Sequence, residues 1–365
     1  MKPRSTNRIK AVGLMSGTSL DGLDLVAVEF WQTDEKWHFH IEAAETVEYS
    51  AEWKNRLKNA PELSGVELIQ LHTEYGRLLG NETKRFIQKN GFKPELISSH
   101  GHTVFHQPEK GFTYQAGSGF EIATVTGITT VADFRSGDVA LGGQGAPLVP
   151  VGDRLLFSEY EYCLNLGGFA NISFEKNGKR VAFDICPVNI ILNHFAEKQG
   201  FSFDKNGELG RKGKVNSALL NNLNQLKFYR AEPPKSLGRE WVANEFIPLL
   251  NQTDISDEDK LRTVYEHIAQ QIAGITGRDK VTDKGRWKML VTGGGAFNAF
   301  LIELISGKTP VELVIPANEI INFKEALIFA FLGVLKIRDE INCLASVTGA
   351  KCDSSVGIVY FSSNI

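Results

Sequence analysis

Two strand-like runs joined by a short turn of small residues occur once in each half of the chain, and this repeated pattern restricts the possible folds most. In the first half, residues 10–15 and 23–30 alternate in polarity as strands do, and the turn between them is rich in Gly and Ser. In the second half, the stretch YCLNLGGFANISF has the same arrangement. Further strands and helices follow each copy, so the sequence predicts two α/β domains built on one plan.

The boundaries of these domains follow from the helices and from one glycine-rich stretch. Apolar residues at helical spacing predict helices over residues 64–90, 187–199, 215–226, 261–276 and 323–340. The stretch RSGDVALGGQGAPLVP follows a strand predicted over residues 127–134 and is typical of a crossover between domains. We therefore expect an N-terminal domain over residues 1–135, completed by a segment near residues 340–365, and a second domain over residues 136–339.

Charge and cysteine content exclude several classes of partner. A formal charge of -3 gives no electrostatic reason to expect binding to nucleic acid or to an anionic membrane. The most apolar run, residues 325–335, is too short to span a bilayer and predicts a buried helix. The four cysteines have no paired spacing, and no apolar segment follows the basic N-terminus. We expect free thiols, a cytoplasmic location and a small-molecule substrate.

The turn in the first half has the composition of a phosphate-binding loop. Closely spaced glycines let backbone N–H groups point at one anion, and hydroxyl side chains add further donors. The turn has no lysine and continues into a strand, so it is not a Walker loop. Two of its acids, Asp21 and Asp24, suit Mg²⁺, which prefers carboxylate and water ligands. An ordinary hairpin loop remains the alternative for this turn taken alone. The candidate phosphate-binding residues are Gly17, Thr18, Ser19, Leu20, Asp21, Gly22, Leu23 and Asp24.

Two later turns strengthen the nucleotide hypothesis. The hairpin in the second half carries a pair of glycines, and a triple glycine stands between a predicted strand and a predicted helix. A glycine at such a turn permits close approach by a flat ring or a phosphate. Three turns of this kind in order predict nucleotide binding better than any one of them. The candidates here are Asn165, Gly167, Gly168, Asn171, Gly293, Gly294, Gly295 and Asn298.

The sequence resembles the family of anhydro-N-acetylmuramic acid kinases, which belongs to the actin-like superfamily. The matching stretches are MSGTSLDGLD, SHGHTVFHQP, VADFRSGDVALGGQGAPLVP, LNLGGFANIS, FDICPVN, PPKSLGRE, GGGAFN and SVTGA, and they run in the family's order from Met15 to Ala350. This resemblance implies two ribonuclease-H-like domains with ATP in the cleft between them, Mg²⁺ as a cofactor and a homodimer. It also implies cell-wall recycling, in which the enzyme hydrolyses the 1,6-anhydro bond of the sugar and phosphorylates its O6.

The resemblance assigns roles to individual residues. Asp184 matches the aspartate taken as general base, which would remove a proton from water as the water attacks the anomeric carbon. Asp133 and Arg135 match the sugar-side segment, where an arginine pairs well with the lactyl carboxylate of the sugar. Glu325, His100 and Asn189 are the further substrate-binding candidates.

Some positions depart from the family's usual residues. Residues 184–189 read DICPVN where the family commonly has DTGPGN, so both glycines and a hydroxyl are replaced. Ser118 stands where an aspartate is usual, His102 where a glutamine is usual and Leu237 where a threonine is usual. The nucleotide segments match more closely than the sugar-side segments, which leaves a kinase of a different sugar as an alternative. A non-catalytic nucleotide-binding module is a second alternative, against which the retained Asp184 argues.

Two further hypotheses, a zinc site and a cysteine nucleophile, concern residues near these motifs. His100, His102 and His106 have a spacing that can bind zinc, but no acidic or cysteine partner lies nearby in sequence. Cys186 lies two residues from Asp184, yet nothing in the sequence supplies a base for it, so a buried apolar role is expected.

Overall fold

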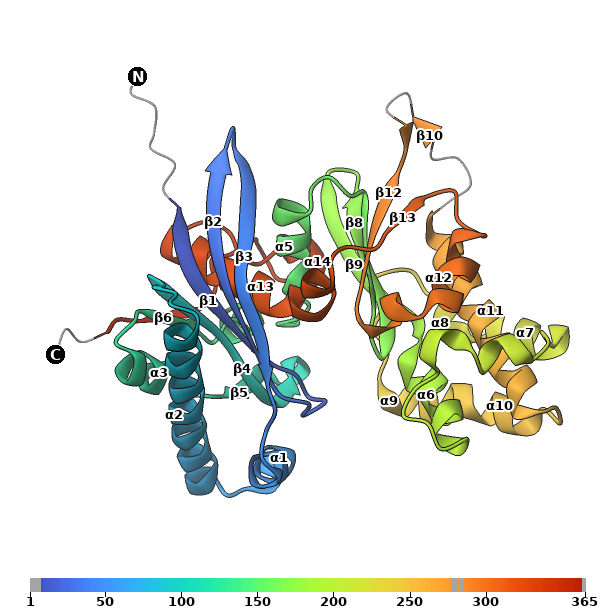
Figure 1. Cartoon of the computed structure of the whole chain (residues 1–365), viewed down its shortest axis with the longest axis horizontal. Coiled ribbons are helices and arrows are strands. Elements are labelled where there is room, and N and C mark those ends of the chain that lie inside the picture. The colour runs from blue at the N-terminus through green and yellow to red at the C-terminus, as the bar shows by residue number, and fades with distance from the viewer. Residues whose placement is uncertain (1–7, 277–280, 283–284, 363–365) are drawn as a thin grey trace. The chain divides into compact units, whose positions relative to one another are not determined.

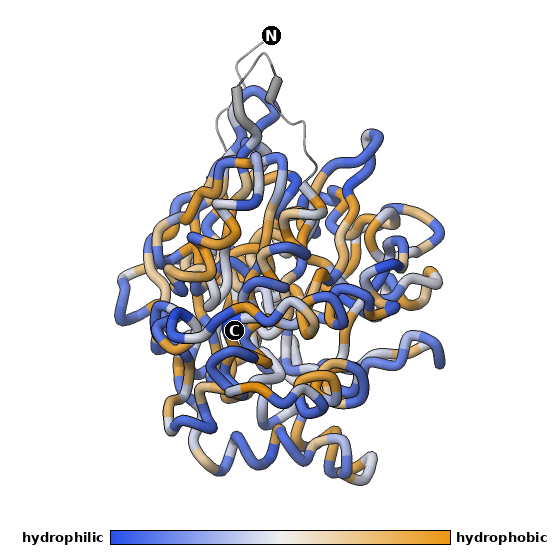
Figure 2. Tube along the Cα trace, turned by 90° about the vertical axis from the view of Figure 1, so that its right-hand side faces the viewer, coloured by the Kyte–Doolittle hydropathy of each residue, from blue (hydrophilic) through white to orange (hydrophobic). Residues whose placement is uncertain are grey.

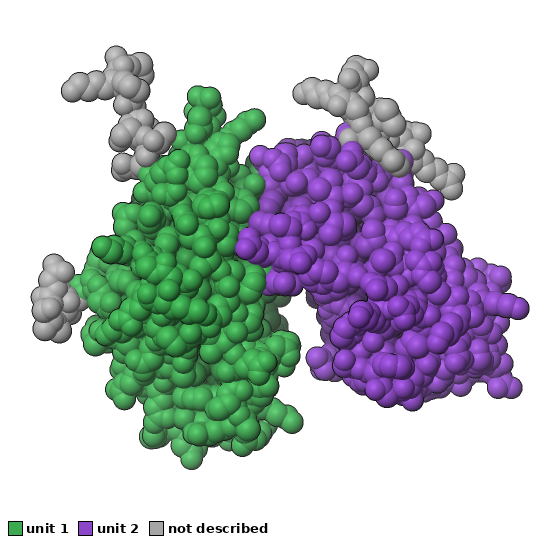
Figure 3. All heavy atoms as spheres, viewed as in Figure 1, with its two compact units in different colours: residues 1–156, 323–365 green, residues 157–322 purple. Residues whose placement is uncertain are grey.

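The protein divides into two compact units in the computed structural model, which describes residues 8–276, 281–282 and 285–362. Unit 1 comprises Met1–Leu156 and Phe323–Ile365, and unit 2 comprises Phe157–Asn322 (Figure 3). The predicted domain ends at residues 1–7 and 363–365 lie outside the described residues. Hydrophilic residues are concentrated in the outlying loops of the trace (Figure 2).

Unit 1 contains a seven-stranded sheet. Its strands are β1 (Ile9–Ser16), β2 (Leu23–Thr33), β3 (Lys36–Val47), β4 (Leu96–Gln107), β5 (Phe112–Ala116), β6 (Thr130–Ala132) and β14 (Ile358–Tyr360). The order is β14-β6-β4-β1-β2-β3, with β5 paired to β4 (Figure 1). Strand β1 is antiparallel to β2 and parallel to β4, and β4 is parallel to β6.

Helices cover both faces of this sheet. The helices of unit 1 are α1 (Ala51–Lys58), α2 (Gly65–Lys89), α3 (Gly119–Thr126), α4 (Ser136–Ala140), α5 (Val149–Leu156), α13 (Asn318–Ile337) and α14 (Ala345–Thr348), and α13 enters the unit at Phe323. Tyr75 and Leu79 of α2 pack with Val12 and Leu14 of β1. On the opposite face, Gly13 lies so close to α13 that a Cβ there would approach Ala326 O to 2.0 Å.

Unit 2 repeats the plan with five strands. The strands are β7 (Tyr162–Leu166), β8 (Phe169–Lys176), β9 (Lys179–Pro187), β12 (Lys288–Thr292) and β13 (Glu312–Val314), in the order β13-β12-β7-β8-β9, and a separate pair joins β10 (Val281–Thr282) to β11 (Gly285–Arg286). Strand β7 is antiparallel to β8 and parallel to β12, as β1 is to β2 and β4. With β5 and β14 of unit 1 and the β10-β11 pair of unit 2 left out, both units have their strands in the order third, second, first, fourth, fifth, which is the duplicated ribonuclease-H-like fold that the family resemblance implies.

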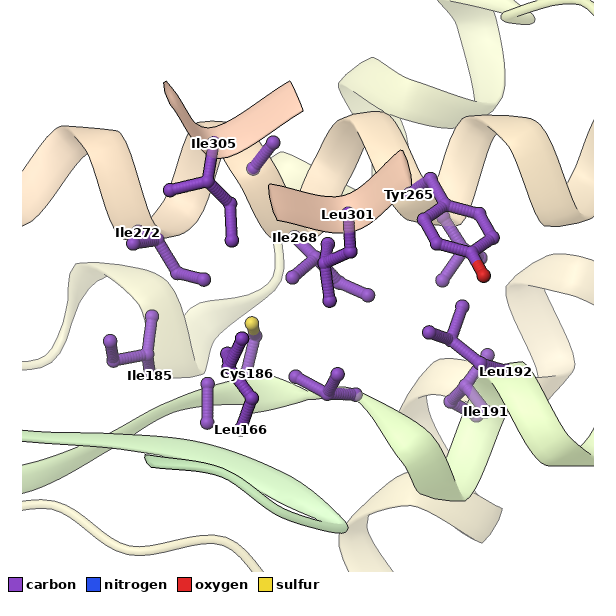
Figure 4. Close-up of a cluster of buried hydrophobic side chains, with 14 of the residues drawn as sticks. Leu166, Ile185, Cys186, Ile191, Leu192, Tyr265, Ile268, Ile272, Leu301 and Ile305 are labelled. Atoms are coloured by element: carbon purple, nitrogen blue, oxygen red, sulfur yellow. The ribbon is translucent and has the colours of Figure 1, made fainter. Parts of the chain in front are cut away.

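An apolar cluster between the sheet and the helices forms the core of unit 2. The helices of this unit are α6 (Asn189–Lys198), α7 (Ser217–Asn224), α8 (Lys227–Arg230), α9 (Arg239–Trp241), α10 (Ile247–Gln252), α11 (Asp257–Thr276) and α12 (Ala299–Ser306). Figure 4 shows Leu166 and Cys186 of the sheet facing Ile268 of α11 and Leu301 of α12. Burial of such apolar side chains is the main stabilising contribution to the fold.

The limits of the two units lie about 20 residues from the expected domain boundaries, because α5 and α13 pack together in unit 1. Lys324 Nζ lies 2.7 Å from Asp153 Oδ1, and both side chains are buried. A Cβ on Gly152 would lie 2.6 Å from Ile328, so the two helices are in close contact. These contacts join residues more than 170 positions apart, and local sequence pattern does not reveal them.

A buried carboxylate joins two of the quoted motifs within unit 1. Asp138 is fully buried, and its Oδ2 accepts a hydrogen bond from Gly145 N at 2.7 Å. Its Oδ1 accepts from Thr348 Oγ1 at 2.7 Å and from Cys343 Sγ at 3.1 Å. A buried carboxylate needs such donors to offset its desolvation, so Asp138 links the glycine-rich stretch to the SVTGA segment.

Two structural details follow from the arrangement of α2 and β4. The helix predicted over residues 64–90 forms as α2, and the apolar residues Val66 and Ile69 near its start are 79% and 66% exposed. Strand β4 extends to Gln107, where it forms a hairpin with β5. The four cysteines are unpaired thiols, as expected, and only Cys352 is exposed.

Candidate active site

The turn after β1 presents open backbone and hydroxyl groups. Leu20 adopts a φ of 62°, and its N–H donates to Gly17 O at 3.3 Å, which closes the turn. Thr18 and Ser19 are exposed. A Cβ on Gly17 would meet only Ser19 Oγ, at 3.4 Å, so a ligand can approach the backbone closely here. The arrangement suits an anion held by main-chain and hydroxyl donors.

Two other members of this predicted segment have packing roles. Leu23 is buried in the core of unit 1. A Cβ on Gly22 would lie 2.6 Å from Val47 O of β3, so glycine is required there by the close approach of that strand.

Asp24 and Asp21 form the acidic part of the turn. Asp24 Oδ1 accepts a hydrogen bond from Thr46 Oγ1 at 2.6 Å, and burial raises the pKa of Asp24, with a further contribution from Asp21. Asp21 is exposed. Two carboxylates with hard oxygen atoms fit the ligand preference of Mg²⁺, which usually takes only one or two protein ligands beside phosphate and water.

The hairpin turn of unit 2 is connected to the start of α6. Val188 N and Asn189 N donate to Gly168 O and Gly167 O, at 2.8 and 3.2 Å. Asn189 Nδ2 donates to Leu166 O at 3.1 Å. Gly168 is exposed, with open space where a Cβ would be. The carbonyls of this turn thus cap the helix, while its outer side stays accessible.

The triple-glycine turn packs directly on that hairpin. Gly293 has a φ of 79°, and a Cβ there would lie 2.5 Å from Asn165 Oδ1. A Cβ on Gly295 would lie 2.7 Å from Leu166 Cβ. The structure therefore brings two of the predicted nucleotide turns together within unit 2.

Asn298 and its hydrogen bonds serve the local fold. Its Oδ1 accepts from Leu301 N at 3.1 Å, which caps α12, and its Nδ2 donates to Tyr265 OH at 2.6 Å. Asn298 is buried, so we assign it a structural role in addition to the predicted one.

The predicted base lies in a row of polar residues across three strands. Asn165 of β7 is paired with Asn171 of β8, which is paired with Asp184 of β9. Residues directly opposite one another in antiparallel strands share a face, so the three side chains are neighbours. Leu237 N donates to Asp184 Oδ2 at 2.8 Å. Burial raises the pKa of Asp184, and the Leu237 hydrogen bond partly offsets that rise.

The segment PPKSLGRE holds this carboxylate in place. Besides the Leu237 bond, Asp184 N donates to Lys235 O at 3.1 Å, so the two segments are joined at two points. The motif was noted from sequence, but the use of the Leu237 backbone N–H was missed, because a backbone donor has no sequence signal.

Cys186 is not a nucleophile in this structure. Its thiol is fully buried in the apolar cluster of Figure 4, and burial, followed by the charge of Asp184, raises its pKa. A thiol with a raised pKa is unreactive because the thiolate is the nucleophilic form. The expected apolar role is confirmed.

Arg135 and His100 form a hydrogen-bonded pair in unit 1. Arg135 Nε donates to His100 Nε2 at 3.0 Å, and Arg135 Nη1 donates to Gly145 O at 2.7 Å. His100 Nδ1 bonds to Gly101 O at 2.9 Å, so both ring nitrogens are engaged and the ring is neutral. Burial lowers the pKa of Arg135 to about 10, with an opposing contribution from Glu325. Within the described residues, no carboxylate lies within ion-pair distance of Arg135.

Asp133 and Glu325 lie at more open positions of the same unit. Asp133 has a φ of 57°, and its Oδ1 accepts from Ser136 N at 3.3 Å. It lines a groove of about 400 Å³ together with Ser354 and Ser355. The side chain of Glu325 on α13 reaches solvent, but the protein around its carboxylate partly desolvates the charged form and thereby raises its pKa.

The three histidines of the zinc hypothesis do not converge. His100 contacts Phe329 of α13, whereas His102 contacts Tyr75 of α2 on the other face of the sheet. Over the described ranges, no group of three His, Cys, Asp or Glu residues is placed to bind a metal ion. Nor does any helix in the described chain combine the length and apolar character needed to cross a bilayer.

The duplicated strand order and the paired glycine turns define a two-unit α/β protein of the ribonuclease-H-like class. A fold alone does not establish a function. The family model described as "Anhydro-N-acetylmuramic acid kinase" matches residues 9–362. The chain belongs to this family, and it is a sugar kinase, a phosphotransferase.

Individual relatives agree over nearly the full length. A protein named anhydro-N-acetylmuramic acid kinase from Vibrio cholerae is 37% identical, covering 96% of this chain and 98% of its own. The protein of that name from Mannheimia succiniciproducens is 36% identical with the same coverage. Among solved structures, the activator of the 2-hydroxyisocaproyl-CoA dehydratase from Clostridium difficile with bound ADPNP has 12% identity and a TM-score of 0.42, covering 90% of this chain and 96% of its own, which is too low to assign a function.

Proposed function

We propose that this kinase uses ATP and water to convert 1,6-anhydro-N-acetylmuramic acid into N-acetylmuramic acid 6-phosphate. The family match over residues 9–362 carries the proposal. The held, partly buried carboxylate of Asp184 supports it, because hydrolysis of the anhydro bond needs a base.

In the proposed reaction Asp184 takes a proton from water. The water oxygen bonds to C1 of the sugar while the C1–O6 bond breaks, and O6 leaves with the electron pair. O6 then bonds to the γ-phosphorus of ATP, and ADP leaves. Burial raises the pKa of Asp184, which makes its carboxylate a stronger base than a free one.

The glycine turns are proposed to bind the phosphates of ATP. In unit 1 the donors are the backbone N–H groups of residues 17–22 and the hydroxyls of Thr18 and Ser19; in unit 2 they belong to the turns at Gly167 and Gly293. Asp21 and Asp24 would hold Mg²⁺, which neutralises phosphate charge when bound. The residues of this chain fix and orient the phosphates.

Arg135 is proposed to bind the lactyl carboxylate of the sugar. Its Nε and one Nη1 hydrogen are already used, which leaves the outer end of the guanidinium for a carboxylate. A partly buried cation with no carboxylate within ion-pair distance among the described residues is costly, and a bound anion would relieve that cost.

We also propose a cytoplasmic homodimer that acts in recycling of the cell wall. Light scattering of the purified chain after gel filtration tests the oligomeric state, and a monomeric mass at working concentration would refute it.

A substrate panel tests the reaction itself. ADP formation is measured with 1,6-anhydro-N-acetylmuramic acid, with N-acetylmuramic acid and with common hexoses. We expect turnover with the anhydro sugar at least about 100-fold above the hexoses, since the lactyl carboxylate and the anhydro bond are both recognised. Preferred turnover of a hexose would indicate a kinase of another sugar, and nucleotide binding without turnover would indicate a non-catalytic module.

A further inference from the structure

A bulge in β4 separates two histidines that strand alternation would place together. In the parallel pairing, Leu14 of β1 lies beside Ser99, whereas Ser16 lies beside His102, so β4 has one extra residue. Gly101 takes a φ of 72° at this point. Side chains at positions i and i+2 normally share a face of the sheet, and one inserted residue moves the second to the other face.

The contacts of the two histidines confirm that they face opposite sides. The His100 ring lies 4.6 Å from the ring of Phe329 in α13, and His100 Nε2 accepts the hydrogen bond from Arg135. The His102 ring lies 6.4 Å from the ring of Tyr75 in α2. His102 Nδ1 is 3.0 Å from Ser16 Oγ, at the last residue of β1 before the phosphate turn.

Ser16 and His102 end a chain of buried hydrogen bonds. Tyr49 OH donates to Ser16 Oγ at 2.8 Å, so the 2.6 Å bond between Tyr49 and Tyr75 must have Tyr75 as its donor. Burial lowers the pKa of His102 to about 4, so the ring is neutral at physiological pH, and we assign Ser16 as the donor to its Nδ1. In this chain the Tyr49 and Ser16 hydroxyls are each both donor and acceptor, which favours a single rigid arrangement.

We propose that His102 is a positioning residue for the nucleotide, because it fixes Ser16 and with it the start of the turn at Gly17. Across the bulge, His100 is the corresponding positioning residue for Arg135 on the sugar side. One strand thereby sets the geometry of both binding segments. This inference rests on the proposed function, which assigns the turn to ATP and Arg135 to the sugar.

The proposal predicts a division between the two Michaelis constants. His102→Leu removes the acceptor for Ser16, and we expect the KM for ATP to rise about tenfold while the KM for the anhydro sugar stays within about twofold. His102→Asn places an amide oxygen near the position of Nδ1 and should restore most of the lost affinity. His100→Leu should instead raise the KM for the anhydro sugar and leave the KM for ATP nearly unchanged. The matched control is His40→Asn, because His40 is exposed on β3 and should change neither constant.

Direct binding separates failure of this inference from failure of the proposed function. The Kd of a non-hydrolysable ATP analogue is measured by titration calorimetry without sugar, beside turnover of the wild-type protein. A wild-type protein that binds no nucleotide overturns both proposals. A wild-type protein that binds and turns over, with an unchanged Kd for His102→Leu or with both KM values raised equally, overturns the inference alone.

A second variant covers the case in which His102→Leu does not fold. Tyr49→Phe keeps the aromatic ring and removes the donor to Ser16 together with the acceptor for Tyr75 OH, so it should raise the Kd for the analogue several-fold without a change in the sugar KM. A Kd equal to that of the wild-type protein would overturn the inference.

Discussion

Replacing Asp184 by Asn should remove catalysis while leaving the site intact. The amide has nearly the size of the carboxylate, and its oxygen can still accept the 2.8 Å hydrogen bond from Leu237 N. What it loses is the ability to take a proton from water. A general base contributes about 10²–10⁴-fold to a rate, which corresponds to about 2.7–5.4 kcal/mol in the activation free energy.

The expected loss is therefore in kcat. Steady-state ADP release is measured over a range of ATP and sugar concentrations, together with the Kd of an ATP analogue. We expect kcat to fall at least about 100-fold and the Kd to stay within about twofold. A kcat above about one tenth of the wild-type value would refute the assignment of Asp184 as the base.

Thermal unfolding of the same variant adds an independent check. A raised pKa means that the native state holds this proton more tightly than the unfolded chain does, so ionisation lowers native stability as pH rises from 3.8 through the raised value. At pH 7 Asp184→Asn should be at least as stable as the wild type. Asp184→Ala leaves Leu237 N unpaired and should lose about 1–3 kcal/mol. Asp254→Asn, at an exposed position, is the matched control.

Three further predictions follow from the geometry. The acid limb of kcat/KM should have an apparent pKa above 3.8, because burial raises that of Asp184 and only the ionised form is active; a rate that stays constant down to pH 4 would argue against this base. Gly101→Ala should lower the free energy of unfolding by more than about 2 kcal/mol, since φ is 72° and the new Cβ would lie 2.6 Å from Ala116 O. Both variants are compared by urea titration, in which Gly91→Ala, with a φ of 61° and open space for a Cβ, should lose only about 1 kcal/mol. Equal losses of unfolding free energy in the two variants would show that the contact with Ala116 O is unimportant. Arg135→Lys should raise the KM for the anhydro sugar at least about tenfold in the steady-state assay, because the planar fork is lost; an unchanged KM would exclude the proposed carboxylate contact.

Local features of the site were predictable from the sequence. The turns at Gly17, Gly167 and Gly293 lie where the glycine and hydroxyl patterns place them, between the expected strands or at a strand end. The duplicated plan was also predicted, because both halves repeat a pattern of strands around a small-residue turn, and the ribonuclease-H-like fold was implied by the family resemblance. Burial of Cys186 followed from the lack of any base for its thiol.

Features that depend on distant partners were not predictable. The bulge at Gly101 is defined by the register of β4 against β1, and the packing of α5 on α13 joins both ends of unit 1. Asn298 was predicted to bind the nucleotide. Its role as the N-cap of α12 depends on the backbone around it, which the sequence motif does not show. The Ser16 and Tyr49 hydroxyls likewise gain their roles only when the strands and α2 are assembled.

Isotope tracing tests the central claim that water opens the anhydro ring while the released O6 accepts the phosphoryl group. The reaction is run in water enriched in oxygen-18, and the product is analysed by mass spectrometry with fragmentation that separates the C1 hydroxyl from the phosphate. The account predicts one labelled oxygen at C1 and none in the phosphate. Label in the phosphate, or an unlabelled C1 hydroxyl, would contradict it.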